Sequence, residues 1–305
     1  MLLASFVRRR IPSAPAASLA ALVVVSALIA ASPRALTAQT AQRGPPARGP
    51  GPSPAVTPVI TPALAAALSV PSRPAFAMGE VLDYRVNVSR AGNIGQGQMR
   101  VEGPVMERGT LTWRLVFVMQ AQRGPIKAID RTTSWIDPTI FATTRFEKTE
   151  RHPLSRDQET VEIDANSSTW TRNNGASQAL ATPLPLDELS FMYFLRSLPL
   201  EQDGTFTFSR HFDAARNPTV VHLRGEEMVD TPAGVFRTRI LDMHVRDPKR
   251  FQGAGAIRIN LDMTGCHMPV RITSRMPIVG TTTLTLTGVG NTATSAETSP
   301  AGCTL

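Results

Sequence analysis

From Gly79 onward the chain is a succession of short segments in which apolar and polar residues alternate, separated by Gly, Pro, Asn and Asp. Alternation with a period of two is typical of a β-strand with one buried face. The pattern is clearest at 111–119, 257–263 and 283–287. Many strands at such spacing predict an all-β, mainly antiparallel domain, built as a strongly curved sheet or open barrel, with a sandwich as the alternative.

The strand at 111–119 is expected to place five large apolar side chains on one face, because every second residue there is apolar. The segment from Gly92 to Gly97 lies between two expected strands and is interpreted as a hairpin turn. Further strands are expected at 80–88, 96–102, 127–136, 140–149, 158–164, 168–172, 205–211, 218–225, 234–245 and 268–275.

One segment, between Leu186 and Leu198, departs from the alternation and predicts a helix at about 187–197. Asp187 has the side chain of an N-cap, and Pro199 cannot continue a helix. Apolar residues lie nearly all round this helix, which is typical of a buried one. We therefore expect it to pack on the concave face of the curved sheet.

The N-terminal region predicts export. Three arginines, at 8–10, precede an apolar run at 16–31 that is followed by small residues, as in a secretory signal peptide. We expect a signal peptide at 1–38, cleaved after Ala38 or alternatively after Ala31, and a periplasmic or secreted protein. An uncleaved signal is the only membrane contact expected, since the run is shorter than the ~20 residues of a membrane span.

Composition divides the remaining chain into three parts. Residues 39–76 are rich in Pro and Ala and are expected to form a disordered linker, because they cannot bury enough apolar surface to offset chain entropy. The β domain is expected at 77–289. The Ser/Thr/Ala-rich tail at 290–305 is expected to be disordered.

The charge distribution excludes nucleic-acid binding. The net charge is +8, but seven of the 32 basic residues precede residue 76, where there is no acidic residue. The rest of the chain holds 25 basic and 24 acidic residues and is close to neutral. A nucleic-acid-binding domain would carry a basic excess in its folded part.

No catalytic, metal or cofactor site is expected. None of the five histidines is spaced as a paired ligand along one strand or helix turn, although His222 and His244 could meet across neighbouring strands. The chain also has no Gly-x-Ser-x-Gly elbow, no phosphate-binding glycine loop and no dinucleotide fingerprint.

The two cysteines favour a disulfide over chemistry. Cys266 lies at an expected hairpin turn and Cys303 in the tail, which can reach it in an oxidising compartment. A Cys266 to Cys303 bond is therefore predicted, with free thiols or an intermolecular bond as alternatives. Cys266 beside His267 also fits a nucleophile, but the disulfide interpretation is simpler.

Apolar side chains on one strand and on the helix form the candidate ligand site. If the helix does not fill the curved sheet, these side chains would line a cavity for an acyl chain or another apolar molecule; if it does, they are core. The candidates are Trp113, Leu115, Phe117, Phe191, Met192 and Phe194.

Several local motifs over about 78–288 together resemble an exported bacterial domain-of-unknown-function family, the one numbered 3108. The motifs are Gly79 to Tyr84, Asp187 to Arg196, Thr231 to Phe236, Met268 to Ile272 and Pro277 to Gly280. The resemblance implies an antiparallel β architecture outside the cytoplasm and implies no reaction. A looser likeness in architecture is to periplasmic lipoprotein-carrier proteins.

These observations favour a non-enzymatic function in the cell envelope, namely binding of a lipid or another apolar envelope component. A structural or protein-interaction module that binds envelope proteins is the alternative, and a hydrolase is the third. A pocket with convergent polar groups of shifted pKa would favour the enzyme.

Overall fold

The computed structural model describes residues 74–292, except 154, 202, 248–252 and 277–279. The predicted signal peptide, most of the predicted linker and most of the predicted tail lie outside the described residues. Phe76, the last residue of the predicted linker, belongs instead to the core, where it is 1% exposed. No helix in the described part of the chain is long and apolar enough to cross a membrane.

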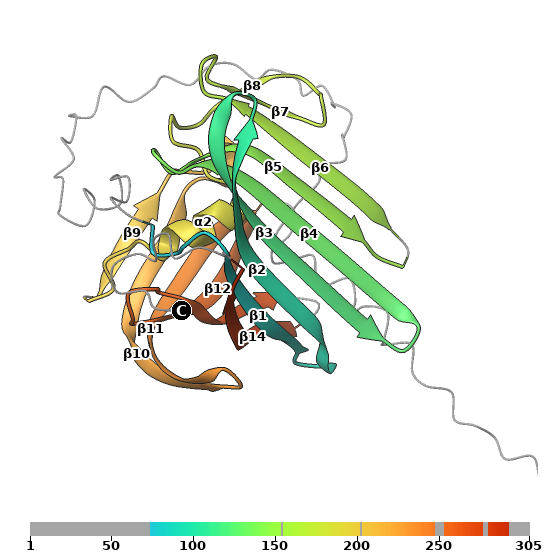
Figure 1. Cartoon of the computed structure of the whole chain (residues 1–305), viewed down its shortest axis with the longest axis vertical. Coiled ribbons are helices and arrows are strands. Elements are labelled where there is room, and N and C mark those ends of the chain that lie inside the picture. The colour runs from blue at the N-terminus through green and yellow to red at the C-terminus, as the bar shows by residue number, and fades with distance from the viewer. Residues whose placement is uncertain (1–73, 154, 202, 248–252, 277–279, 293–305) are drawn as a thin grey trace, which may run out of the picture.

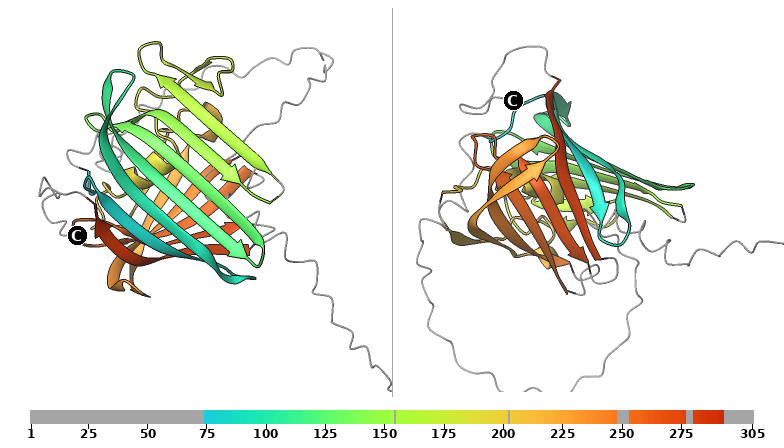
Figure 2. Two further views of the ribbon diagram at one scale, coloured as in Figure 1. Left: turned by 45° about the vertical axis from the view of Figure 1, so that its right-hand side comes forward. Right: turned by 90° about the horizontal axis from the view of Figure 1, so that it is seen from below.

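The described residues form one antiparallel sheet of 14 strands that curves around a single α-helix (Figures 1 and 2). The sheet is not closed, since its edges are β8 and β9. The predicted curved sheet or open barrel is therefore confirmed, and the sandwich alternative is not observed. The elements are β1 (Glu80–Val88), β2 (Gly92–Glu107), β3 (Thr110–Arg123), β4 (Ile126–Asp137), β5 (Ala142–Arg151), β6 (Arg156–Asp164), β7 (Thr169–Arg172), β8 (Gln178–Ala179), α2 (Glu188–Leu195), β9 (Gly204–Phe208), η3 (Ala214–Arg216), β10 (Thr219–Thr231), β11 (Gly234–Asp247), β12 (Gly253–Asp262), β13 (Pro269–Met276) and β14 (Gly280–Asn291).

The strand order follows the chain order except at one junction. Strands β1 to β8 form one meander and β9 to β14 another, and the two meanders join where β1 pairs with β14. The register there runs from Glu80 opposite Asn291 to Val88 opposite Thr282. The first and last strands therefore lie side by side in the middle of the sheet.

The segment from Gly92 to Gly97 is part of β2, so its interpretation as a hairpin turn was wrong. The turn lies one step earlier, where the Ala91 N–H donates to the Val88 carbonyl at 2.9 Å. At Gly95 a Cβ atom would lie 1.9 Å from the Gln120 carbonyl oxygen, so β2 and β3 can approach only because this residue is glycine.

The apolar row on β3 is shorter than predicted. Leu115, Phe117 and Met119 are buried and Trp113 is partly buried against the core, but Leu111 is 54% exposed. The register between β2 and β3 shifts between Glu102 and Val105, and Leu111 lies beyond that shift, next to the hairpin turn. The core therefore ends at Trp113.

Helix α2 packs inside the curve of the sheet against β3 and β4, as predicted. Its buried side chains include Phe191, Tyr193 and Phe194, which join a core built from both meanders. A second, smaller cluster of buried side chains lies under β5 to β7, around Phe146 and Trp170.

A buried ion pair fixes the end of the helix. Arg196, directly after α2, donates from Nη1 and Nη2 to the two carboxylate oxygens of Glu80 at 2.6 and 2.7 Å, and both residues are 0% exposed. Nη2 also donates to the Cys266 carbonyl at 2.8 Å. Burial acts to lower the pKa of Arg196, but the Glu80 carboxylate outweighs it and raises this pKa. One guanidinium thus joins the helix, the first strand and the β12–β13 turn.

We predict that Arg196→Met lowers the free energy of unfolding by about 3–5 kcal/mol, because it leaves the Glu80 carboxylate buried without its partner. Urea denaturation measures this. Arg258→Met, which breaks the exposed pair between Arg258 and Asp242, is the matched control and should cost about 1 kcal/mol or less. Equal effects of the two substitutions would contradict the role assigned to Arg196.

Candidate functional site

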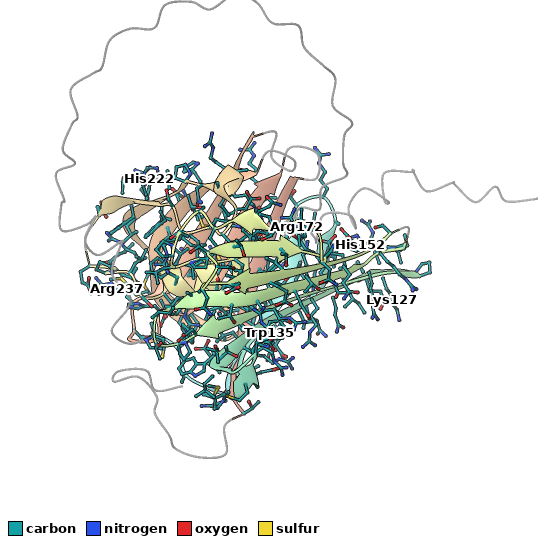
Figure 3. All side chains as sticks on the ribbon, turned by 90° about the horizontal axis from the view of Figure 1, so that it is seen from above. Lys127, Trp135, His152, Arg172, His222 and Arg237 are labelled. Atoms are coloured by element: carbon teal, nitrogen blue, oxygen red, sulfur yellow. The ribbon has the colours of Figure 1, made fainter. Side chains whose placement is uncertain are left out.

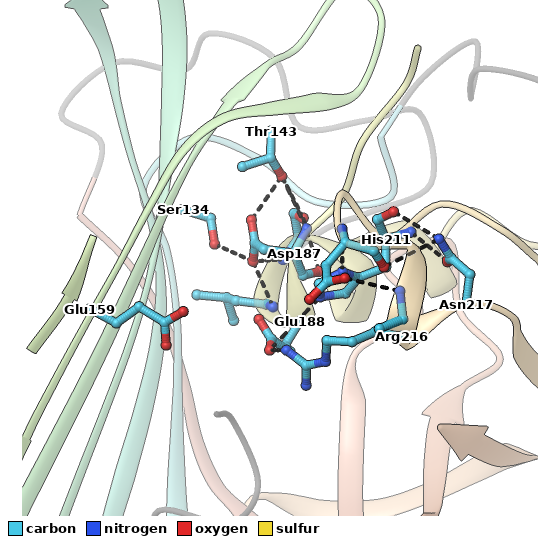
Figure 4. A network of polar contacts seen from close by, with 12 residues as sticks. Ser134, Thr143, Glu159, Asp187, Glu188, His211, Arg216 and Asn217 are labelled. Atoms are coloured by element: carbon cyan, nitrogen blue, oxygen red, sulfur yellow. Dashed lines mark hydrogen bonds and ion pairs between the residues drawn. The ribbon is translucent and has the colours of Figure 1, made fainter. Parts of the chain in front are cut away.

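A network of polar side chains surrounds Asp187, the residue directly before α2 (Figure 4). The Asp187 Oδ1 atom accepts hydrogen bonds from the Leu189 and Ser190 N–H groups at 2.8 and 3.0 Å, which caps the helix as predicted. It also accepts from the Ser134 hydroxyl at 2.7 Å, and Oδ2 accepts from the Thr143 hydroxyl at 2.7 Å. Burial raises the pKa of Asp187, and the hydrogen bond from Ser134 opposes that rise.

The next residue, Glu188, belongs to a separate charged group. Its carboxylate pairs with Arg216 of η3, and its Oε1 atom lies 3.9 Å from Nε2 of His211. Burial acts to raise the pKa of Glu188, but Arg216 and His211 outweigh it and hold this pKa far below its usual range. The His211 Nδ1 atom accepts a hydrogen bond from the Asp213 N–H at 3.0 Å.

A boundary between apolar and polar side chains runs along the concave face between β3 and β4. The residues that face each other across it are Leu115 and Ser134, Phe117 and Thr132, and Met119 and Asp130. All of these side chains are at most 4% exposed. The concave face is therefore apolar on β3 and polar on β4 from Asp130 to Ser134, with the apolar residues Ala128 and Ile136 on either side.

The polar side continues onto β5 and β6. Lys148 lies opposite both Thr132 and Glu159, and it is ion-paired with Glu150. Glu159 is 5% exposed and lies 2.7 Å from Nε of Arg172. Burial raises the pKa of Glu159, although Arg172 opposes the rise. Buried charges at this density are rare in a domain core unless each has a partner.

Two side-chain oxygens on this polar face have no hydrogen-bond partner among the described residues: Oδ2 of Asp130 and Oγ1 of Thr132. The other oxygen of Asp130 contacts Nε2 of His152 at 2.8 Å. Ser274 and Thr282, which pair across β13 and β14, have unpartnered hydroxyls of the same kind. Leaving such a group buried and unpaired costs about 1–3 kcal/mol, so each requires a physical reason.

The structure brings the predicted ligand residues into one apolar core. Leu115, Phe117 and Phe194 are at most 4% exposed and Phe191 is 9% exposed, while Trp113 and Met192 are partly buried against them. Trp113 contacts the ring of Phe76, with centroids 6.0 Å apart, whereas Phe191 and Phe194 contact Phe208 on β9 at 5.5 and 5.4 Å.

A hollow of about 530 Å³ opens elsewhere, where the ends of β2, β3 and β4 meet. None of the predicted ligand residues lines it. Its lining residues are Asn93, Ile94, Gly95, Gln96, Gln120, Ala121, Gln122, Lys127, Ala128 and Ile129.

The predicted contact between two histidines is present, since the rings of His222 and His244 lie 5.5 Å apart. In the described part of the chain, no three His, Cys, Asp or Glu residues are grouped so that they could hold a metal ion. Cys266 is buried and is not a free thiol. Its predicted partner, Cys303, lies outside the described residues, so that pairing stays a prediction.

An open antiparallel sheet around one buried helix defines the class of the protein as a β-barrel-like, all-β domain. The chain belongs to the family described as protein of unknown function (DUF3108), whose sequence profile matches residues 83–287. The resemblance drawn from the local motifs is thus confirmed. Comparison with curated proteins finds no match.

Three solved structures are similar over about 70% of this chain. A β-barrel-like protein of the domain-of-unknown-function family DUF1849 from Brucella abortus is 12% identical, with a TM-score of 0.46 over 70% of this chain and 98% of that chain. An exported protein with a YmcC-like fold from Bacteroides fragilis is 11% identical, with a TM-score of 0.26 over 70% and 97%. A lipoprotein from Parabacteroides distasonis is 10% identical, with a TM-score of 0.27 over 72% and 99%.

Sequence reasoning missed the polar half of the concave face. The sequence does place Asp130, Thr132 and Ser134 at alternate positions of one strand, with Lys148 and Glu159 at matching positions on the next two strands. An alternating strand is normally read with its polar residues toward solvent, and nothing in the sequence marks this strand as the reverse case.

We predict that Asp187→Ala lowers the free energy of unfolding by about 3 kcal/mol, because it removes the cap and leaves buried donors unpaired. Asp187→Asn keeps an acceptor oxygen and should cost about 1 kcal/mol. Urea denaturation measures both. Asp213→Ala removes the N-cap of the exposed η3 turn and is the control. If it were as damaging as Asp187→Ala, the network around α2 would have no special role.

The raised pKa of Glu159 predicts that the free energy of unfolding depends on pH. The pKa of Glu159 is higher in the folded protein than its ordinary value of 4.5, so the protonated carboxyl group stabilises the folded state at pH values below 4.5. This stabilisation is lost as the pH rises through the pKa of the folded state. The free energy of unfolding of Glu159→Gln, relative to the unmodified protein, should therefore increase with pH above about 4.5. Urea titrations at several pH values measure the trend; a decrease would contradict it.

Proposed function

We propose that the protein binds an amphipathic molecule of the bacterial envelope, with one apolar chain and a polar head, on the concave face of its sheet. The observation that carries this proposal is the boundary between β3 and β4, together with the unpartnered oxygens of Asp130 and Thr132 beside it. The proposal includes the predicted location outside the cytoplasm, which depends on the signal peptide expected at 1–38.

The two sides of the boundary match the two parts of such a ligand. An apolar chain of the ligand packs against the apolar side chains of β3, Phe117 and Met119. A hydroxyl, amide or ammonium group of the head donates a hydrogen bond to Oδ2 of Asp130, and an acceptor of the head accepts a hydrogen bond from the Thr132 hydroxyl. The bound head thereby removes the cost of two unpaired buried oxygens.

Binding, rather than catalysis, fits the chemistry of the polar side. Two pairs of opposite charge lie on it, Lys148 with Glu150 and Arg172 with Glu159, and their charged groups face each other. A general acid or base would need a proton acceptor or donor free to face the reacting atom. We therefore assign these residues to recognition.

The first test is native mass spectrometry, with solvent extraction, of the full chain purified after export. We expect a bound amphiphile that organic solvent releases. Identical bare masses under native and denaturing conditions would contradict the proposal.

The second test removes one hydroxyl. Thr132→Val should weaken the binding of a fluorescent fatty acid about five-fold to tenfold, the effect of one hydrogen bond, without lowering stability, because that hydroxyl has no partner in the protein. Thr133→Val, on the opposite face of the same strand, is the matched control and should leave the dissociation constant unchanged. Equal binding by both variants would remove Thr132 from the site.

A second candidate function, binding to an envelope protein, is favoured by the tip of the β10–β11 hairpin. Met228 is 63% exposed and Val235 is 65% exposed at this tip. Cross-linking in intact cells from a residue next to them, Asp230→Cys, tests this candidate, and recovery of the chain without a partner would contradict it.

A further inference from the structure

We infer that the far end of the convex sheet face docks on an anionic lipid surface. Four cations and one apolar side chain on β4, β5 and β6 form this surface, which we call the convex basic patch. All five are exposed, and they occupy alternate positions on the side of the sheet away from α2. The patch consists of Lys127, Ile129, Arg131, Arg151 and Arg156.

Strand register places these side chains together. Ile129 faces Arg151 across β4 and β5, and Arg151 faces Arg156 across β5 and β6. Neighbouring strands are about 4.8 Å apart and successive residues about 3.3 Å, so the patch covers roughly 10 by 13 Å. Figure 1 shows the β3–β4 and β5–β6 hairpins ending at one side of the molecule, and Figure 3 shows Lys127 at that end.

The cations of the patch have no carboxylate partner among the described residues, unlike the cations on the other half of the same face. There, Arg114 donates to Glu102 at 2.8 Å and Arg145 donates to Glu107 at 3.1 Å. The domain as a whole is nearly neutral, with 25 basic against 24 acidic residues after residue 75. The excess of positive charge at this end is therefore local, and it is available to an external anion.

Two further features favour a lipid surface over an acidic protein. Ile129 is 40% exposed in the middle of the cations, where it can contact the apolar region below lipid headgroups. The hollow of about 530 Å³ adjoins the patch and shares Lys127 and Ile129 with it. Its other lining residues include Gln96 and Gln120, whose side-chain amides can donate hydrogen bonds to phosphate and carbonyl oxygens. Cations, amides and one apolar side chain together match an anionic phospholipid headgroup.

The test is co-sedimentation of the full exported chain with vesicles of phosphatidylcholine alone or mixed with phosphatidylglycerol. We expect binding to the mixed vesicles only, and weaker binding as salt is added. Each cation near such a surface strengthens partitioning about five-fold, so Arg131→Gln, Arg151→Gln and Arg156→Gln together should weaken it roughly a hundredfold.

The matched control is Arg224→Gln, Arg237→Gln and Arg246→Gln, which removes the same charge from exposed positions on β10 and β11. It leaves the arginines that precede residue 76 in place, as the patch variant does. Urea denaturation of both variants verifies that they fold. Equal weakening by both variants would overturn the inference, as would equal binding to the two kinds of vesicle.

Binding to soluble polyglutamate without binding to anionic vesicles would also overturn it, in favour of an acidic protein partner. The vesicle assay is independent of the proposed ligand on the concave face. Failure of the vesicle assay would leave the extraction result unchanged, and a protein that carries no ligand can still bind vesicles through the patch.

Discussion

The buried pair of Arg196 with Glu80 is the interaction on which the arrangement of the sheet and helix depends. Helix α2 has apolar side chains on nearly all sides, so burial alone does not fix its rotation or its position along its axis. The Arg196 guanidinium fixes both, because it must contact the Glu80 carboxylate and the Cys266 carbonyl at the same time. At the other end of α2, the Asp187 carboxylate is held from β4 and β5. Polar contacts at both ends of α2 thus define the position of a helix whose other side chains are mostly apolar.

The unclosed sheet gives the molecule two different halves. In a closed barrel the two edge strands would pair with each other. Here, short segments that follow β8 and β9 in the chain are hydrogen-bonded to each other instead. The Leu186 N–H donates to the Arg210 carbonyl at 2.6 Å, and the Phe212 N–H donates to the Leu186 carbonyl at 3.3 Å. These bonds join the segments that follow the two edges, beside the start of α2. The buried polar side chains of β4 to β6, such as Asp130, Lys148 and Glu159, lie on the half of the sheet next to this incomplete seam.

The sequence was sufficient for the local structure. The strand at 80–88 and the cap at Asp187 agree with the structure, because period-two alternation and capping are set by neighbouring residues. Contacts between distant residues were not predictable in this way. Nothing near Glu80 indicates that its partner is Arg196, and the alternation at Asp130 and Thr132 does not show which face is inside. The turn assigned to the glycines from Gly92 to Gly97 failed because those glycines serve close strand packing.

The pairing of β1 with β14 also has a consequence for the order in which the chain can fold. The Thr292 hydroxyl and the Gly79 carbonyl that meet beside these strands are 213 residues apart in the sequence. Each meander can form as its own hairpins emerge, but the two halves cannot be joined until the last strand has been synthesised. Pairing over such a separation is slow, because a long loop must close first. A newly made chain therefore cannot complete its sheet until its final strand is available.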